Sequence, residues 1–110
     1  MIINRMRNTI RSTRRSTRKP SVRRALVQAS AATAFWEHDG KVLYNLKDLL
    51  AALRKIDGET FAFHVTKEKN DYADWTAVVL GDEELARTLR RIRTLRTTIQ
   101  KIAKRLEEYA

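Results

Sequence analysis

The uneven distribution of charge limits how this chain can fold. The 110 residues include 23 Lys and Arg and 13 Asp and Glu, yet the first 24 residues contain nine basic side chains and no acidic one. This segment has almost no apolar residue after Ile10, so it cannot build a core of its own. The remaining residues are nearly charge-balanced and must supply the whole core. The chain is therefore expected to form one domain preceded by a flexible basic arm.

Residues 1–20 form this arm, which is rich in Arg, Ser and Thr and contains the tandem repeat RSTR-RSTR. Guanidinium groups bind phosphate through paired hydrogen bonds, and hydroxyl groups add neutral donors, so the composition indicates phosphate binding. Two alternatives stay open: a solvated tail that keeps the protein soluble, and an organellar transit peptide. If the arm binds phosphate, the nucleic-acid contacts at this end of the chain are Arg5, Arg7, Arg11, Arg14, Arg15, Arg18, Lys19, Arg23 and Arg24.

The composition also argues against several classes of protein. The chain has no cysteine, which excludes disulfides, thiolate metal sites and thiol nucleophiles. No apolar run approaches the roughly 18 residues of a membrane span, and the basic N-terminus lacks the apolar core of a secretory signal. We expect a cytoplasmic protein that is nucleoid-associated or contained in a virion.

Residues 21–90 are expected to form a small globular domain. Pro20 and Ser21 favour a helix start, so about 22–32 is predicted to be a short Ala-rich helix. The Asp39-Gly40 pair lies between segments that suit strands, which predicts a β-hairpin over about 34–45. Apolar spacing and capping residues then predict three short helices, at about 46–56, 59–67 and 71–80.

The core of this domain is expected around the stretch from Phe61 to Leu89. Its larger apolar side chains recur at helical spacing, and the helix before it carries a leucine face. Asn70-Asp71 and Gly81-Asp82 have the character of helix boundaries, as do Asn45 ahead of the leucine face and Asp57-Gly58 after it. The predicted core residues are Leu46, Leu49, Leu50, Leu53, Phe61, Val65, Tyr72, Trp75 and Val79.

The order of several short motifs in residues 34–90 resembles an uncharacterised prokaryotic module that is frequent in archaea. The matching segments are WEHDGKVL at 36–43, FAFHV at 61–65, EKNDYA at 68–73 with Trp75, and GDEELA at 81–86. The resemblance implies a compact folding unit and a prokaryotic or viral source. It implies no activity, since the module has no assigned one. The arm and the C-terminal region lie outside it.

Residues 82–108 contain no Gly or Pro after an acidic start, which predicts one long basic amphipathic helix. No acid interrupts its basic face, which we expect to contact nucleic acid through Arg87, Arg90, Arg91, Lys101 and Arg105. A second set of residues is spaced by seven, as in a coiled coil, and predicts self-association as a homodimer or higher assembly through Leu85, Ile92, Ile99 and Leu106. Packing of this helix onto its own domain is the alternative.

The sequence offers little for catalysis or metal binding. His38-Asp39, and His64 with Glu68 one helical turn later, lack a third clear ligand and a phosphate-binding glycine loop. We therefore expect no enzymatic activity, catalytic residue, metal, cofactor or small-molecule substrate. Membrane-surface binding ranks below nucleic acid, because the aromatic residues that would insert lie in the globular part.

Together these features predict an α+β fold that is mostly α: a flexible basic arm, one short β-hairpin, three short helices and a long C-terminal amphipathic helix. The predicted function is non-sequence-specific nucleic-acid binding by an architectural protein of the chromatin, nucleoid or virion-packaging kind, with DNA favoured over RNA. One alternative is a ribosome-associated or other small RNA-binding protein. The other is a protein-interaction adaptor that uses the C-terminal helix.

Overall fold

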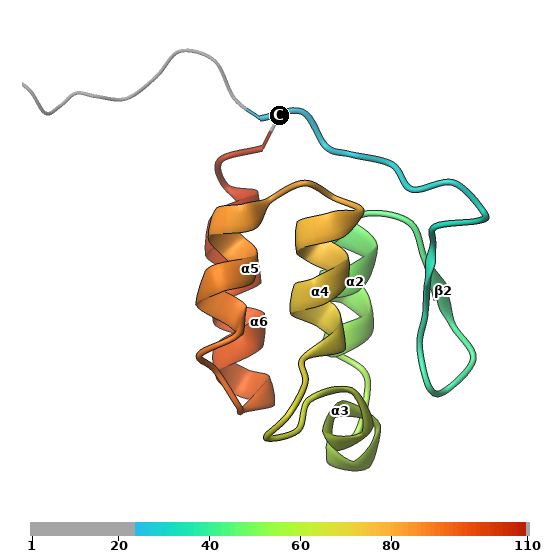
Figure 1. Ribbon diagram of the computed structural model, residues 1–110, viewed down its shortest axis with the longest axis vertical. Coiled ribbons are helices and arrows are strands. Elements are labelled where there is room, and N and C mark those ends of the chain that lie inside the picture. Colours follow the sequence, from blue (N-terminus) through green and yellow to red (C-terminus); the bar gives the residue numbers. More distant parts are fainter. Residues whose placement is uncertain (1–23, 110) are drawn as a thin grey trace, which may run out of the picture.

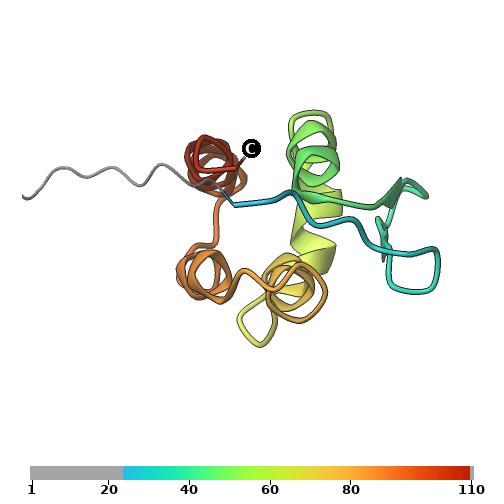
Figure 2. The same cartoon turned by 90° about the horizontal axis from the view of Figure 1, so that it is seen from above.

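A computed structural model of the chain describes residues 24–109, which form an α+β and mostly α fold (Figure 1). The bundle helices α2, α4, α5 and α6 run side by side, α3 lies at one end of the bundle, and the hairpin flanks it (Figures 1 and 2). The elements in chain order are β1 Phe35–Trp36, β2 Val42–Leu43, α2 Leu46–Leu53, α3 Gly58–His64, α4 Asp71–Val78, α5 Glu83–Leu89 and α6 Leu95–Leu106.

Short polar side chains fix where the helices begin. Asn45, Asn70 and Asp82 each accept a hydrogen bond from a backbone N–H in the first turn of α2, α4 and α5, at 2.8, 3.0 and 3.1 Å. These three predicted boundaries are confirmed. Asp57-Gly58 was expected to end the helix over 46–56, but α2 ends at Leu53 and Asp57 instead caps α3 through the Thr60 N–H at 2.8 Å.

The predicted hairpin is present and antiparallel, with Phe35 opposite Leu43 and Trp36 opposite Val42. Gly40 supplies the positive φ of +99° in the connecting loop, a conformation that costs glycine little. Alternation along β1 buries Phe35 and leaves Trp36 67% exposed. The hairpin therefore presents one face to the helices.

The core contains the residues that the apolar spacing predicted. The leucine face of α2 is buried, and Phe61, Val65, Tyr72 and Trp75 are buried against it, while Val79 is partly buried. The Phe35 ring stacks on Tyr72, with ring centroids 5.2 Å apart, and meets Trp75 edge-on at 5.6 Å. These contacts join the hairpin to α4.

The helix predicted for about 22–32 is wrong over the described part of that range. Residues 24–30 are irregular, and 31–33 form a turn. Their backbone groups find partners in other segments: the Arg24 N–H donates to Glu108 O at 3.0 Å, and the Ala29 N–H donates to Tyr44 O at 2.7 Å. Tertiary pairing has replaced a helix too short to be stable alone.

The single helix predicted for 82–108 is also wrong. The chain leaves α5 at Arg90, turns back, and re-enters a helix at Thr94, whose side chain accepts from the Thr97 N–H at 3.2 Å. The resulting α5–α6 hairpin lets α6 pack on both α2 and α5. Ile102 is fully buried there, and such burial outweighs the helix-forming tendency of the connecting residues.

The two tryptophans provide a matched test of this core. Trp75 is 7% exposed and its Nε1 donates to Thr33 O at 2.8 Å, so Trp75→Ala should lower the free energy of unfolding by about 3–5 kcal/mol. Trp36→Ala removes the same side chain from an exposed site and should change the free energy of unfolding by less than about 0.5 kcal/mol. Chemical denaturation followed by circular dichroism measures both. Equal losses would contradict the assignment of Trp75 to the core.

Candidate nucleic-acid interface

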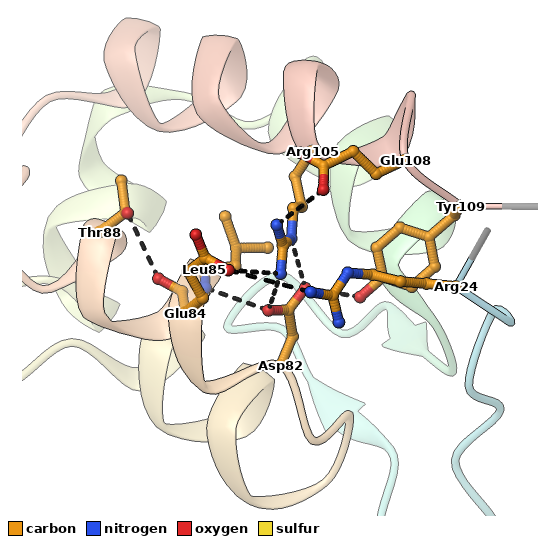
Figure 3. A network of polar contacts seen from close by, with 8 residues as sticks. All are labelled: Arg24, Asp82, Glu84, Leu85, Thr88, Arg105, Glu108 and Tyr109. Carbon is orange, nitrogen blue, oxygen red and sulfur yellow. Dashed lines mark hydrogen bonds and ion pairs between the residues drawn. The ribbon is translucent and has the colours of Figure 1, made fainter. Parts of the chain in front are cut away.

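The base of the α5–α6 hairpin is closed by a buried ion pair (Figure 3). Arg105 Nε donates to Asp82 Oδ2 at 2.9 Å and Nη2 donates to Oδ1 at 2.8 Å, and the two side chains are 9% and 2% exposed. Tyr109 Oη also donates to Asp82 Oδ2, at 2.6 Å. Because Asp82 precedes α5 and Arg105 lies near the end of α6, this contact fixes the two helices antiparallel.

The ion pair shifts the pKa of each participant. Burial alone would raise the pKa of Asp82, but the hydrogen bonds from Arg105 and Tyr109 outweigh it and lower the pKa to about 2. The hydrogen bond to Asp82 raises the pKa of Arg105 despite burial. Burial, followed by the hydrogen bond to Asp82, raises the pKa of Tyr109 to about 12. All three groups therefore hold the paired form across the physiological pH range.

Arg105 was predicted to contact nucleic acid, and its position contradicts that prediction. Its guanidinium is buried and engaged by Asp82, with further contacts to Glu108 at 3.0 Å and Glu84 at 3.4 Å. Helical periodicity placed Arg105 on the basic face because it could not reveal that the fold brings Asp82 beneath it. A phosphate would have to break a buried pair to reach this side chain.

The arm joins the domain beside the same ion pair. Arg24 has its N–H bonded to Glu108 O, and its guanidinium lies 3.9 Å from Glu84. Arg24 is exposed and can still meet an external anion. The other predicted arm contacts lie outside the described residues: Arg5, Arg7, Arg11, Arg14, Arg15, Arg18, Lys19 and Arg23.

The turn between α5 and α6 gathers exposed arginines, which we call the turn cluster: Arg87, Arg90, Arg91, Arg93 and Arg96. Arg90 pairs with Asp74 of α4 at 3.0 Å, and both side chains are substantially exposed. The other four form no ion pair with any residue in the range 24–109. Arg87 has Glu83 one helical turn away, but Arg91, Arg93 and Arg96 have no acidic partner in the folded domain that relieves their mutual repulsion.

Acidic side chains gather at the other end of the same hairpin. Glu83 and Glu84 begin α5, and Glu107 and Glu108 follow α6, and all four are exposed. The 12 residues of α6 span about 18 Å, so Glu107 and Glu108 lie far from the turn, whereas in the shorter α5 Arg87 lies one helical turn from Glu83. The hairpin therefore has a positive end and a negative end.

Lys101 and Lys104 lie between these two ends. Both are exposed on α6, and neither forms an ion pair within the described part of the chain. They border a shallow hollow that also includes Glu84 and Glu108. The basic face of α6 is thus continuous from the turn to Lys104, where it meets the acids.

The seven-residue row predicted for self-association does not form a seam. Leu85 is buried in α5, and Ile92 lies in the turn. Ile99 and Leu106 on α6 are partly buried against the domain's own core. The row crosses a helix break and its side chains pack within the monomer, so the coiled-coil basis of the prediction is lost.

His64 is part of a buried polar cluster with Glu37, Asp71 and Tyr72. Its Nδ1 lies 2.9 Å from Asp71 Oδ2, and its Nε2 accepts from the His38 N–H at 3.0 Å, which places the ring proton on Nδ1. Glu68, the partner predicted from helical spacing, is not involved. Because the backbone amide occupies Nε2, the imidazole ties the hairpin to α3 and α4.

Glu37 completes this cluster from the hairpin. It accepts from Tyr72 Oη at 2.7 Å, and its Oε1 is buried with no hydrogen-bond partner in residues 24–109. Burial raises the pKa of Glu37, while Tyr72 opposes that rise. Burial and the hydrogen bond to Glu37 also raise the pKa of Tyr72. The cluster is a polar joint between the hairpin and the bundle.

Sequence reasoning missed the side chains that the α3–α4 loop brings to the turn cluster. Lys67 and Lys69 of that loop border the same hollow as Arg90 and Arg93. The available signal was Thr94, a residue type that favours helix starts, standing directly before the apolar positions of α6. That signal would have placed the turn, but no local pattern identifies the loop it faces.

Comparisons of the chain with protein-family models, curated proteins and solved structures gave no match. Within residues 24–109, no helix combines the length and hydrophobicity needed to cross a bilayer. The same residues contain no group of three or more His, Cys, Asp or Glu side chains arranged to hold a metal ion. The charges of the exposed side chains and their arrangement on the domain are therefore the observations that bear on function.

Loss of the Asp82–Arg105 pair should be costly. Arg105→Met keeps much of the apolar stem but leaves Asp82 buried without its counter-charge, and should lower the free energy of unfolding by about 3–5 kcal/mol. The matched control, Arg91→Met, alters an exposed arginine with no acidic partner in the folded domain and should change it by less than about 0.5 kcal/mol. Urea denaturation distinguishes them, and a small effect of Arg105→Met would contradict the role of the pair.

The lowered pKa of Asp82 predicts acid sensitivity. Its carboxylate is stabilised in the fold, so its contribution is complete above the ordinary value of 3.8 and is lost as the pH falls toward about 2. Asp82→Asn retains a helix-capping side chain without the charge. The difference in unfolding free energy between wild type and this variant should shrink by about 2 kcal/mol from pH 5 to pH 2. A difference independent of pH would exclude Asp82 as its source.

Proposed function

We propose that this protein binds nucleic acid without sequence specificity, holding phosphate backbones with its basic arm and its turn cluster. Such binding is electrostatic and needs exposed cations that are not neutralised internally. The segregation of charge along the α5–α6 hairpin is the observation that supports this most directly. Solubility alone favours mixed charges over a single-sign cluster.

The arrangement provides two separate contacts for a polyanion. The arm departs from Arg24 at the acidic end of the hairpin, and the turn cluster lies at the other end, with Lys101 and Lys104 between them on α6. Repulsion from the acids at the first end would keep a backbone near the turn cluster and along α6. Bound phosphates would relieve the repulsion among the unpaired arginines.

The spread of cations over several elements in residues 24–109 favours backbone contacts. These side chains come from the end of α5, a turn and the outer face of α6. Base readout usually comes from several side chains on one helix that enters a groove. We accordingly propose an architectural role on DNA, with binding to RNA as the related alternative.

The adaptor hypothesis loses its main support. It depended on a long exposed helix that could dock a partner helix, and that region is instead divided into α5 and α6, which pack on each other. Interaction through another surface would need a different basis.

The dependence of affinity on salt tests the proposal. Each phosphate contact on duplex DNA contributes about −0.9 to the slope of log affinity against log salt. A variant that lacks residues 1–19 and carries Arg23→Ala loses eight of the chain's 23 basic groups. Its slope should be shallower by several units. Arg87→Ala with Arg91→Ala should reduce it by up to about two. Fluorescence anisotropy with duplexes of two unrelated sequences measures both effects.

A charge-matched control separates contact from net charge. Lys47→Ala with Arg54→Ala removes two exposed cations on or next to α2 that border neither the hollow at the turn nor the hollow beside Lys101 and Lys104, and should leave the slope nearly unchanged. Affinities for the two duplexes should stay equal in every variant. Wild-type protein that shows no salt-dependent binding, or a strong preference for one sequence, would refute the proposed function.

A further inference from the structure

A polar hollow of about 210 Å³ opens between the α3–α4 loop and the turn cluster. The loop supplies Lys67 and Lys69, and the turn supplies Arg90 and Arg93. Two acids, Glu68 and Asp74, also border it. Four cations therefore surround the hollow against two anions, which leaves an excess of positive charge.

The local ion pairs leave two of these cations free. Arg90 is held by Asp74 at 3.0 Å, and Lys69 is held by Asp71 at 3.1 Å. Lys67 and Arg93 are exposed and form no ion pair with residues 24–109. Lys67 comes from the α3–α4 loop and Arg93 from the turn, so each of the two segments brings one such cation to the border of the hollow.

Buried contacts join the two walls of the hollow. Asn70 donates from Nδ2 to Leu89 O at 3.0 Å, joining the end of the loop to the end of α5. Val65 and Asn70 pair across the loop, and α4 and α5 pack extensively on each other. The backbone on both sides of the hollow is therefore already in place, and only the exposed side chains of Lys67 and Arg93 need to adjust to an anion.

Size and charge define the class of ligand. Pockets that enclose whole small molecules usually measure about 300–1,000 Å³, so this hollow is suited to one charged group rather than a complete ligand. Paired guanidinium and ammonium donors suit phosphate oxygens.

We propose that this hollow is a phosphate subsite, in which Lys67 and Arg93 clamp one backbone phosphate of the bound nucleic acid. The proposal rests on the proposed function for the source of the phosphate, and it adds the α3–α4 loop to the interface. Lys69 and Arg90, each paired with a carboxylate, form the walls of the hollow. The hollow would fix the position of the nucleic-acid backbone at one point on the domain.

Two double variants with equal loss of charge test the subsite in the full-length protein. Lys67→Ala with Arg93→Ala removes the clamp, and Lys47→Ala with Arg54→Ala removes one Lys and one Arg from exposed sites on or next to α2 that do not border the hollow. Anisotropy with a labelled duplex should show about tenfold weaker binding and a slope shallower by up to about two units for the clamp variant. The control should weaken binding by no more than about twofold. Equal weakening in both overturns the subsite.

A second measurement separates the subsite from the proposed function. Titration of wild-type protein with inorganic phosphate, followed by amide NMR shifts, should perturb Lys67, Asn70 and Arg93, and the clamp variant should lose this response. If wild type binds no duplex but shows the localised shifts, the hollow is a site for free phosphate groups and the nucleic-acid function fails. If duplex binds but the clamp variant equals the control, the function stands and the subsite is wrong. Wild type with neither response refutes both.

Discussion

The buried contact between Asp82 and Arg105 fixes the direction in which the second half of the domain folds. It makes the basic region a hairpin, because residues on either side of the turn must meet at its base. Without it, only the apolar burial of Ile102, with Ile99 and Leu106 beside it, would hold α6 in place. The same contact buries Arg105 next to Glu84 and Glu108. It therefore contributes to the separation of positive and negative charge along the α5–α6 hairpin.

A second polar joint holds the hairpin of strands to this bundle. Glu37, His64, Asp71 and Tyr72 link the β1–β2 loop, α3 and α4 within a setting that is otherwise aromatic. Polar groups in such surroundings are costly unless paired, so they restrict the hairpin to one placement. The two joints lie on different sides of the bundle. One positions the β1–β2 hairpin, and the other positions the charged surface of the α5–α6 hairpin.

Local patterns predicted the strands, the short helices and most of the core, because each depends on residues close in the sequence. The leucine periodicity of α2 and the caps at Asn45, Asn70 and Asp82 are of this kind. The division of the C-terminal helix depended on contacts between distant segments, which compete with a strong local preference for helix. The role of Arg105 was invisible for the same reason: its partner is 23 residues away. Basic composition identified Arg87, Arg90 and Arg91 of the turn cluster, but not Arg93, Arg96 or the loop lysines that share the hollow.

The segment from Arg24 to Thr33 crosses the bundle without forming a helix and is joined to it by few backbone contacts, among them those to Glu108 and Tyr44. Its contacts with the remainder of the domain are distant in sequence, including the bond from Trp75 to Thr33, 42 residues apart. None of residues 24–33 is fully buried, and segments with little buried surface open at a lower free-energy cost than a core. The strip can therefore open while the bundle stays folded, which would release Arg24 from Glu108 and move the point at which the preceding residues join the domain.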